Sequence, residues 1–277
     1  LTLPAAAVNL QGYRFTDSYR YSVLDDSLLE RFARNYVLTA SLNHIHSPVS
    51  ISNNSYNISA GRYIKQTNML TLGYSYYFSD IVAVGLDTQI VRNSNDDEAS
   101  YFMGDSILKG KINLFREDGW SLSVNPQLFI PTGASNSFAE VEQLAGALSV
   151  VGEKSLLSKL HFLASLGYFS GRENIYDAID YRDLILAQLG VSLDLTESWN
   201  LNGEIYRNFL TSRDYGQDEG TYFVTMKNKT TESISTYFGL GVAGASELDR
   251  DNYTLFAGLK FSEAAEKPLL NPRQVPV

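Results

Sequence analysis

The stretch that decides the fold is residues 67–78, which read TNMLTLGYSYYF. From residue 70 onward every second side chain is apolar or aromatic, and the side chains between them are mostly small or polar. Successive side chains of a strand point to opposite faces, so this alternation predicts a strand with one apolar and one wetter face. The following segment repeats the pattern, with apolar side chains at Val82, Val84, Leu86 and Ile90.

The same alternation recurs along most of the chain and predicts twelve strands. They span about residues 35–46, 67–78, 81–92, 105–116, 120–131, 140–152, 157–169, 183–195, 199–210, 220–228, 232–244 and 252–261. The connections alternate between short turns, such as Glu117-Asp118-Gly119, and longer polar stretches, such as Pro48 to Gln66. Short turns on one side and long loops on the other are typical of bacterial outer-membrane barrels.

A soluble β-sandwich also alternates, and three features favour the barrel over it. The strands are long enough to cross a bilayer at a tilt. Aromatic side chains, Trp120 and Trp199 among them, gather at strand ends, where interfacial girdles lie. Glycines recur inside the strands and permit the coiling of a closed sheet. The fold class expected is all-β, a transmembrane barrel of about twelve antiparallel strands with short periplasmic turns and longer extracellular loops, in a Gram-negative outer membrane.

Composition excludes several classes of function. The 277 residues include no cysteine, which excludes a disulfide framework and a thiol nucleophile. The formal net charge of −9 argues against binding to nucleic acid. No apolar run is long enough for a membrane helix.

The chain divides into three parts. Residues 35–261 are the barrel. Residues 1–34 precede it and form either a plug inside the lumen or an arm lying against the periplasmic turns. Residues 262–277 contain three prolines and form a periplasmic tail or linker. Beyond this tail we expect either a peptidoglycan-binding domain of the OmpA type or a disordered end. An even strand number predicts that both termini lie on the short-turn, periplasmic side.

In such a barrel the inward face carries the function, because the lipid-facing side must stay apolar. The alternation places a set of polar side chains in the lumen as candidates for a constriction: Asp87, Gln89, Lys109, Lys111, Gln127, His161, Glu204 and Tyr206. Among them, Lys109 and Lys111 should pair with Asp87 on the neighbouring strand. We expect side chains to fill most of the interior of a barrel of this size.

Catalysis and metal binding find little support. No Gly-x-Ser-x-Gly motif is present, and nothing assembles a nucleophile, a base and an orienting group, so we expect no enzyme and no cofactor. His44 and His46 point to one face of the first barrel strand, a spacing that could offer two imidazoles to a metal. The sequence identifies no third ligand, so no metal site is expected.

Expected partners follow from the surface. Acidic runs in the long loops, at 95–98, 214–219 and 247–251, are either a solvated surface or sites where divalent cations bridge to lipopolysaccharide. Small outward residues such as Ala40, Gly146 and Ala257 either serve strand coiling or let barrels pack into a homo-oligomer.

Two motifs resemble a known family. One is Gly104-Asp105-Ser106 leading to Lys109-Gly110-Lys111, and the other is the stretch 125–133, which reads NPQLFIPTG. Both are similar to the transporter-like barrels related to the phenol meta-pathway porins, and the pattern extends over about residues 67–261. The resemblance implies a twelve-stranded barrel and uptake of small hydrophobic or aromatic solutes. The chain departs from the family in its long N-terminal arm and its Pro-rich tail.

Two functions remain open on the sequence. The first is a narrow porin-like channel for small solutes. The second is a non-conducting barrel that organises the envelope as a homo-oligomer and is tethered to peptidoglycan.

Overall fold

The structure is a computed structural model, and it describes residues 6–7, 15–18, 20–22, 24–27, 35–50, 64–79, 81–94, 99–133, 144–156, 159–170, 175–176, 179–180, 183–210, 219–244 and 253–262. Twelve long strands form the barrel: β2 (Tyr36–Ser50), β3 (Ile64–Tyr77), β4 (Val82–Ser94), β6 (Ser106–Glu117), β7 (Trp120–Ile130), β8 (Ala145–Leu156), β9 (Leu160–Ser170), β12 (Asp183–Asp194), β13 (Trp199–Leu210), β14 (Glu219–Lys229), β15 (Ile234–Gly244) and β16 (Tyr253–Ser262). Each of the twelve predicted strands is confirmed, with ends shifted by a few residues.

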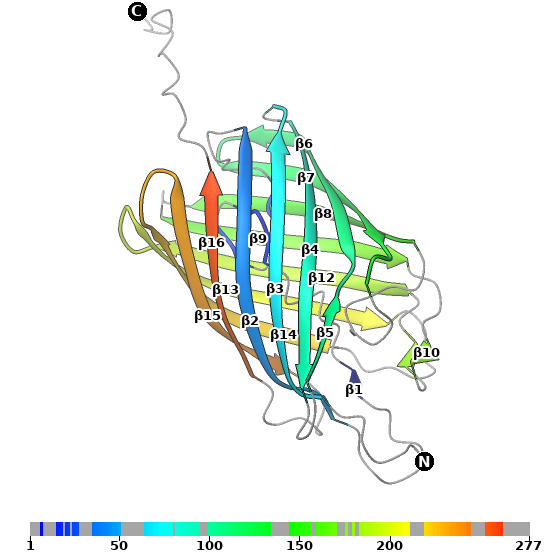
Figure 1. Ribbon diagram of the computed structural model, residues 1–277. Helices are drawn as coiled ribbons and strands as arrows, with labels where there is room; N and C mark the ends of the chain where they lie inside the picture. Colours follow the sequence, from blue (N-terminus) through cyan, green and yellow to red (C-terminus); the bar gives the residue numbers. More distant parts are fainter. Residues whose placement is uncertain are drawn as a thin grey trace, which may run out of the picture.

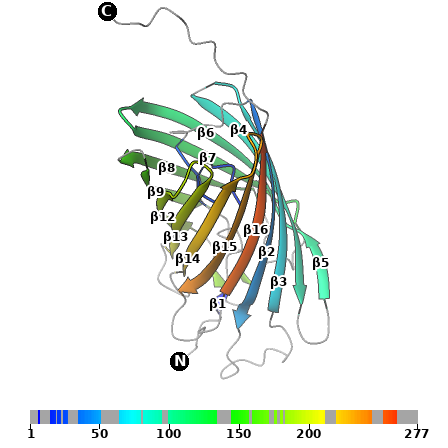
Figure 2. The ribbon, with the colours of Figure 1, turned by 90° about the vertical axis from the view of Figure 1, so that its left-hand side faces the viewer.

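The strands close into a barrel (Figures 1 and 2). Each barrel strand pairs antiparallel with the next one along the chain, and β16 pairs with β2 to complete the ring. Closure gives each of the twelve described barrel strands a partner on both sides, which is the condition for a sheet to cross a membrane. Two short strands extend this sheet, β1 (Ala6–Ala7) beside β2 and β5 (Ala99–Met103) beside β4. A small separate hairpin joins β10 (Ile175–Tyr176) to β11 (Ile179–Asp180).

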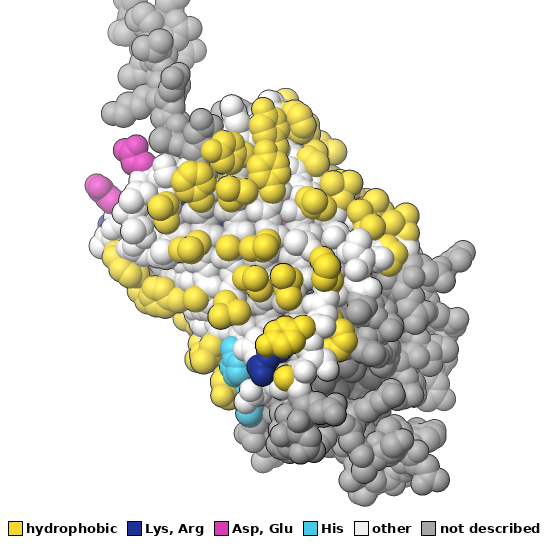
Figure 3. All heavy atoms as spheres, viewed as in Figure 1, with side chains coloured by type: hydrophobic (Ala, Val, Ile, Leu, Met, Phe, Trp, Pro, Cys, Tyr) yellow, Lys and Arg dark blue, Asp and Glu magenta, His cyan; other side chains and the backbone are white. Residues whose placement is uncertain are grey.

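The alternation in the sequence becomes an outer and an inner face. In β8, for example, Leu148 and Val150 point outward and are about half exposed, whereas Val151 is buried inside. Figure 3 shows the resulting apolar outer face over the front strands. Aromatic pairs such as Tyr76 with Phe78 and Trp199 with Phe238 lie toward the short-turn end, at the level expected for an interfacial girdle.

The two ends of the barrel differ, as the loop lengths predict. At the short-turn end, the upper end in Figure 1, β6 and β7 are joined by Asp118 and Gly119, whose φ angles of 49° and 73° lie in the left-handed region. Gly119 adopts this conformation without strain because it has no Cβ. At the opposite, long-loop end the connections are longer.

The N-terminal part of the chain corrects one expectation. The even strand number predicts both termini at the short-turn end. β2 begins there and β16 ends there, but Ala6 and Ala7 pair with Ser50 and Val49 at the long-loop end of β2. Since β2 begins at the short-turn end, the described residues before it reach from one end of the barrel to the other.

The predictions on the acidic loop runs at 95–98 and 247–251, on the stretch 214–218 and on the tail from residue 263 concern residues outside those that the structure describes. Among the residues that are described, no helix is long and apolar enough to cross a membrane.

Candidate functional site

All eight candidate residues lie on the inner face of the barrel. Six of them are buried, and Gln127 and Tyr206 are half-buried. Their position follows from the register, because each occupies an inward position of its strand. What surrounds them was not predictable from the strand pattern.

The centre of the barrel holds part of the N-terminal chain. The described residues of this N-terminal segment, within 15–27, are buried by the barrel wall, and Tyr21, Leu24 and Ser22 have no exposed surface. The segment is seen inside the ring of strands in both ribbon views (Figures 1 and 2). These described residues therefore lie inside the barrel and not against its outer surface.

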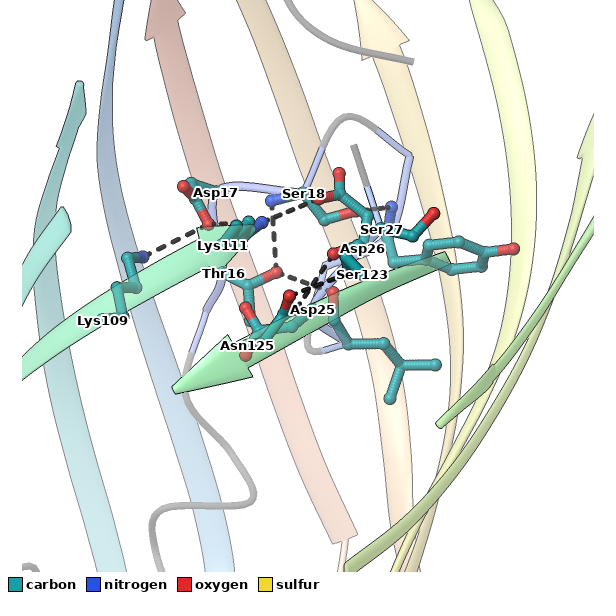
Figure 4. A network of polar contacts seen from close by, with 12 residues as sticks. Thr16, Asp17, Ser18, Asp25, Asp26, Ser27, Lys109, Lys111, Ser123 and Asn125 are labelled. Atoms are coloured by element: carbon teal, nitrogen blue, oxygen red, sulfur yellow. Dashed lines mark hydrogen bonds and ion pairs between the residues drawn. The ribbon is translucent and has the colours of Figure 1, made fainter. Parts of the chain in front are cut away.

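Two lysines of β6 bind the carboxylates of the segment (Figure 4). Lys111 Nζ lies 2.7 Å from Asp26 Oδ1 and 3.0 Å from Asp17 Oδ1. Lys109 Nζ lies 3.3 Å from Asp17 Oδ1 and 2.9 Å from Asp87 Oδ1 of β4. Because these side chains are almost fully buried, the ion pairs are little screened by water or salt. The two lysines therefore connect strands β4 and β6 of the wall to the segment.

Two inward glycines make room for these ion pairs. A Cβ at Gly85 would lie 2.6 Å from Lys109 Cε, and a Cβ at Gly73 would collide with the carboxylate of Asp87. Side chains at either position would displace the Lys109–Asp87 pair. From the sequence, these glycines are predicted to permit coiling of the sheet. The structure shows that they also leave room for the Lys109–Asp87 pair.

Asp17 has a strongly shifted pKa. Burial by itself raises the pKa of this carboxyl, but the ammonium groups of Lys109 and Lys111 outweigh burial and hold the pKa well below its ordinary value. A depressed pKa means that Asp17 stabilises docking fully above its ordinary pKa. This contribution is lost only as the pH falls through the lower value of the docked state.

We therefore expect acidification to leave the segment docked. Between neutral pH and about pH 4, the ordinary range of carboxyl groups, the maleimide labelling rate of a cysteine placed at Ser18 should stay unchanged relative to that of a free thiol at the same pH, because the thiolate is the reacting species. The control is the same measurement on Asp17→Asn protein carrying the cysteine. A relative labelling rate of the parent that rises already near pH 5 would contradict the assignment.

Two wall glutamates bind the main chain of the segment. Glu204 of β13 accepts hydrogen bonds from Ser22 N at 3.0 Å, Ser22 Oγ at 2.6 Å and Leu24 N at 3.2 Å. Glu153 of β8 accepts from Ser27 N at 3.2 Å and Ser27 Oγ at 2.6 Å. Buried N–H groups need partners, and a carboxylate is a strong acceptor for them. These two acids fix the turns of the segment.

Amide side chains on β7 and β13 bind further polar groups of the segment. Asn125 Nδ2 donates to Asp26 O at 3.0 Å, Gln127 Nε2 to Asp25 Oδ2 at 2.8 Å, and Asn202 Nδ2 to Arg20 O at 3.1 Å. Donors and acceptors of the wall thus match the segment over several strands.

Lys260 of β16 is a wall cation that the candidate set omitted. Its Nζ donates to Ser18 O at 2.6 Å and Tyr21 O at 2.7 Å, and it lies 4.1 Å from the ring centre of Tyr237. The alternation of the last strand places residue 260 inward, so its orientation was available from sequence. Its partners are main-chain carbonyls, which no sequence pattern marks.

The segment also packs through apolar contacts. Phe15 lies edge-on to Tyr237, with ring centres 5.3 Å apart, and belongs to a buried cluster with Tyr21 and Leu24. These side chains pack against inward glycines of the wall. A Cβ at Gly258 would lie 2.7 Å from Phe15 Cζ, and one at Gly190 would lie 2.7 Å from Tyr21 Cε1.

His161 belongs to a polar group near the short-turn end. Its Nε2 lies 3.4 Å from Asp194 Oδ2, and its Nδ1 is 2.8 Å from Ser155 Oγ. Arg20 Nη1 of the segment lies 2.6 Å from Asp194 Oδ1. The Arg20–Asp194 ion pair adds a contact between wall and segment at some distance from the two lysines of β6.

A second apolar cluster lies inside the long-loop end, and the candidate set omitted it as well. It lines the inner face from β6 to β12 and consists of Ile107, Phe129, Ala145, Ala147, Phe169 and Leu184. Phe129 and Phe169 meet edge-to-face with ring centres 5.2 Å apart. The sequence could have indicated this cluster, because its members are apolar residues at inward positions near the strand ends.

The two motifs of the family resemblance meet beside this cluster. Gly133 N donates to Asp105 Oδ1 at 3.2 Å, and Ser106 N donates to Thr132 Oγ1 at 2.8 Å. Asp105 is buried, so its carboxylate holds the start of the loop after β7 against the start of β6. These residues shape the long-loop rim of the interior.

His44 and His46 point to the outer surface rather than the lumen. Within the described part of the chain, no group of three His, Cys, Asp or Glu side chains is placed to hold a metal ion.

Comparisons with known proteins agree with the barrel. A crystal structure of an outer membrane channel from Pseudomonas putida F1 is similar at 16% identity, with a TM-score of 0.66 over 90% of this chain and 99% of that one. The KdgM porin is similar at 9% identity with a TM-score of 0.55, covering 81% of this chain and 99% of that chain. The NanC porin gives 10% identity and a TM-score of 0.57, covering 81% of this chain and 100% of that chain. At these identities the likeness shows the fold.

No curated protein sequence matches the chain. A family profile does, the one described as the MetA-pathway of phenol degradation, and it covers residues 45–266. That range contains nearly the whole barrel, including both motifs. The chain therefore belongs to the MetA-pathway of phenol degradation family, as a Gram-negative outer-membrane β-barrel.

Proposed function

We propose that the protein is a porin-like channel for small solutes, and that its N-terminal segment closes the route through the barrel until it shifts. The observation that carries this proposal is the match between a polar inner wall and a segment bound only by side-chain contacts. None of the described residues between 15 and 27 belongs to a strand. The segment can therefore move without breaking the barrel ladder.

The apolar cluster at the long-loop end supports a preference among solutes. A solute entering from outside meets Phe129 and Phe169 before it reaches the charged level of Lys109. An apolar or aromatic solute gains contact area there, whereas an ion does not. This agrees with the aromatic compound in the family description and with the channel and porin descriptions of the similar structures. Those descriptions favour transport over catalysis.

A non-conducting structural barrel is the second candidate, and the filled interior favours it. Asp17, Lys109 and Lys111 inside the barrel have almost no exposed surface. The homo-oligomer and the attachment to peptidoglycan stay predictions.

A replacement of the segment separates the two candidates. Residues 15–27 are exchanged for a glycine-serine linker of equal length, and single-channel currents are recorded in a planar bilayer. We expect large stable steps from this variant and small or rare steps from the parent protein. The matched control carries the same linker in place of residues 263–275, which follow the last strand, and should behave as the parent. A folded linker variant that passes no current would overturn the channel and leave the structural barrel.

A further inference from the structure

A polar patch interrupts the apolar outer face at the long-loop end. It consists of His44 and His46 on β2, Gln66 and Asn68 on β3, and Arg92 on β4. Figure 3 shows the histidines and a neighbouring cationic side chain together at the lower border of the apolar face. One step nearer the barrel middle on the same strands, Leu42 and Ile90 are 56% and 41% exposed. The patch therefore lies where the apolar belt ends.

The register aligns these side chains in two rows across the strands. His44 is opposite Asn68, which is opposite Arg92, and His46 is opposite Gln66. Neighbouring strands are about 4.8 Å apart, so the backbone positions of His44 and Arg92 are separated by roughly 10 Å. His44 and Arg92 flank the amide of Asn68.

Neighbouring groups hold these side chains in place. His44 Nδ1 lies 2.9 Å from Asn68 Oδ1, and His46 stacks on Tyr253 with ring centres 4.9 Å apart. Arg92 Cζ lies 5.8 Å from the ring centre of Tyr101. Among the described outward side chains of β16, β2, β3 and β4 there is no carboxylate to neutralise the patch.

We propose that this patch binds a phosphate group of the lipid A headgroup of lipopolysaccharide in the outer leaflet. Depth and charge both point to this occupant. The long-loop end faces the outside, where headgroups with phosphates lie at the border of the apolar belt. The guanidinium of Arg92 presents a planar fork that suits phosphate, and the imidazoles of His44 and His46 add polar ring nitrogens beside it. The proposal stands apart from the channel function, because the patch lies on the outer surface.

Binding of purified lipid A to the full-length protein in nanodiscs tests the proposal. Retained lipid A per barrel is measured by mass spectrometry for the parent and for the double variant Arg92→Gln with His44→Gln. We expect retention to fall about tenfold, the order of one charge-assisted hydrogen bond lost. The parent should bind dephosphorylated lipid A as weakly as the variant binds intact lipid A, and excess phosphatidylethanolamine should not restore the difference.

Arg207→Gln is the matched control. Arg207 is also an outward cation near the long-loop end and lies over Phe209 at 4.9 Å, but on the far strands of the barrel. It should leave retention within about twofold of the parent, because it lacks the histidines. An equal loss in this control means diffuse attraction to charge, and unchanged retention in the double variant means no site; either result overturns the proposal. Heat-modifiable mobility on a gel verifies that each variant is folded.

Discussion

Replacing Lys111 by glutamine should release the N-terminal segment from the barrel. Lys111 Nζ contacts both Asp17 and Asp26 of the segment, at 3.0 and 2.7 Å. Without this cation, two buried carboxylates lose a charged partner, and breaking a buried pair costs about 3 kcal/mol. The segment can avoid this cost by moving to water. We expect the docked-to-undocked ratio to fall about a hundredfold, since each tenfold change corresponds to about 1.4 kcal/mol.

The absence of native cysteines gives a direct measurement of this release. A cysteine in place of Ser18, whose side chain is fully buried when docked, should react with a maleimide much faster in the Lys111→Gln background. Planar-bilayer currents should rise in parallel. Lys154→Gln is the control, because Lys154 lies over Trp120 at 4.7 Å on the outer surface and its loss removes the same charge from the barrel. Unchanged labelling in both variants would show that Lys111 does not hold the segment.

The strands and their faces were predictable from the sequence because a strand imposes a period of two on its side chains. That period also placed Lys109, Lys111 and Glu204 inside. The position of the N-terminal segment was not predictable in this way. Its described residues have no periodicity, and Glu204 and Lys260 bind its main-chain N–H and C=O groups, which every residue type shares. Such contacts require no particular residue types in the segment, so its sequence does not indicate them.

The inward glycines of the wall show the same limit of prediction from sequence. The sequence pattern assigns Gly190 and Gly258 to inward positions of strands, where a glycine indicates coiling or a close approach. Which side chains approach these two glycines is known only from the structure. Tyr21 and Leu24 lie on Gly190, and Phe15 lies on Gly258.

The double variant Gly190→Ala with Gly258→Ala should therefore displace the segment by steric conflict alone. Each added methyl would lie 2.7 Å from an aromatic carbon of Tyr21 or Phe15. Phe15 has little room to yield, because Tyr237 and Phe256 pack against it with ring centres at 5.3 and 6.4 Å. Overpacking costs about 1–3 kcal/mol per site.

The two sites lie on different strands and meet different side chains, so their costs should nearly add. The summed overpacking cost predicts that the rate of maleimide labelling at position 18 rises at least about tenfold, although the charge of the protein is unchanged. The barrel itself should remain as stable as the parent, since alanine is less costly than glycine within a strand. Gly203→Ala is the matched control, because a Cβ at that outward position of β13 meets no atom within 4 Å. Faster labelling in this control, or none in the double variant, would show that the glycines do not seat the segment. An effect of the glycine variants together with that of Lys111→Gln would mean that shape and charge hold the segment independently, so that a solute has to overcome both before the barrel opens.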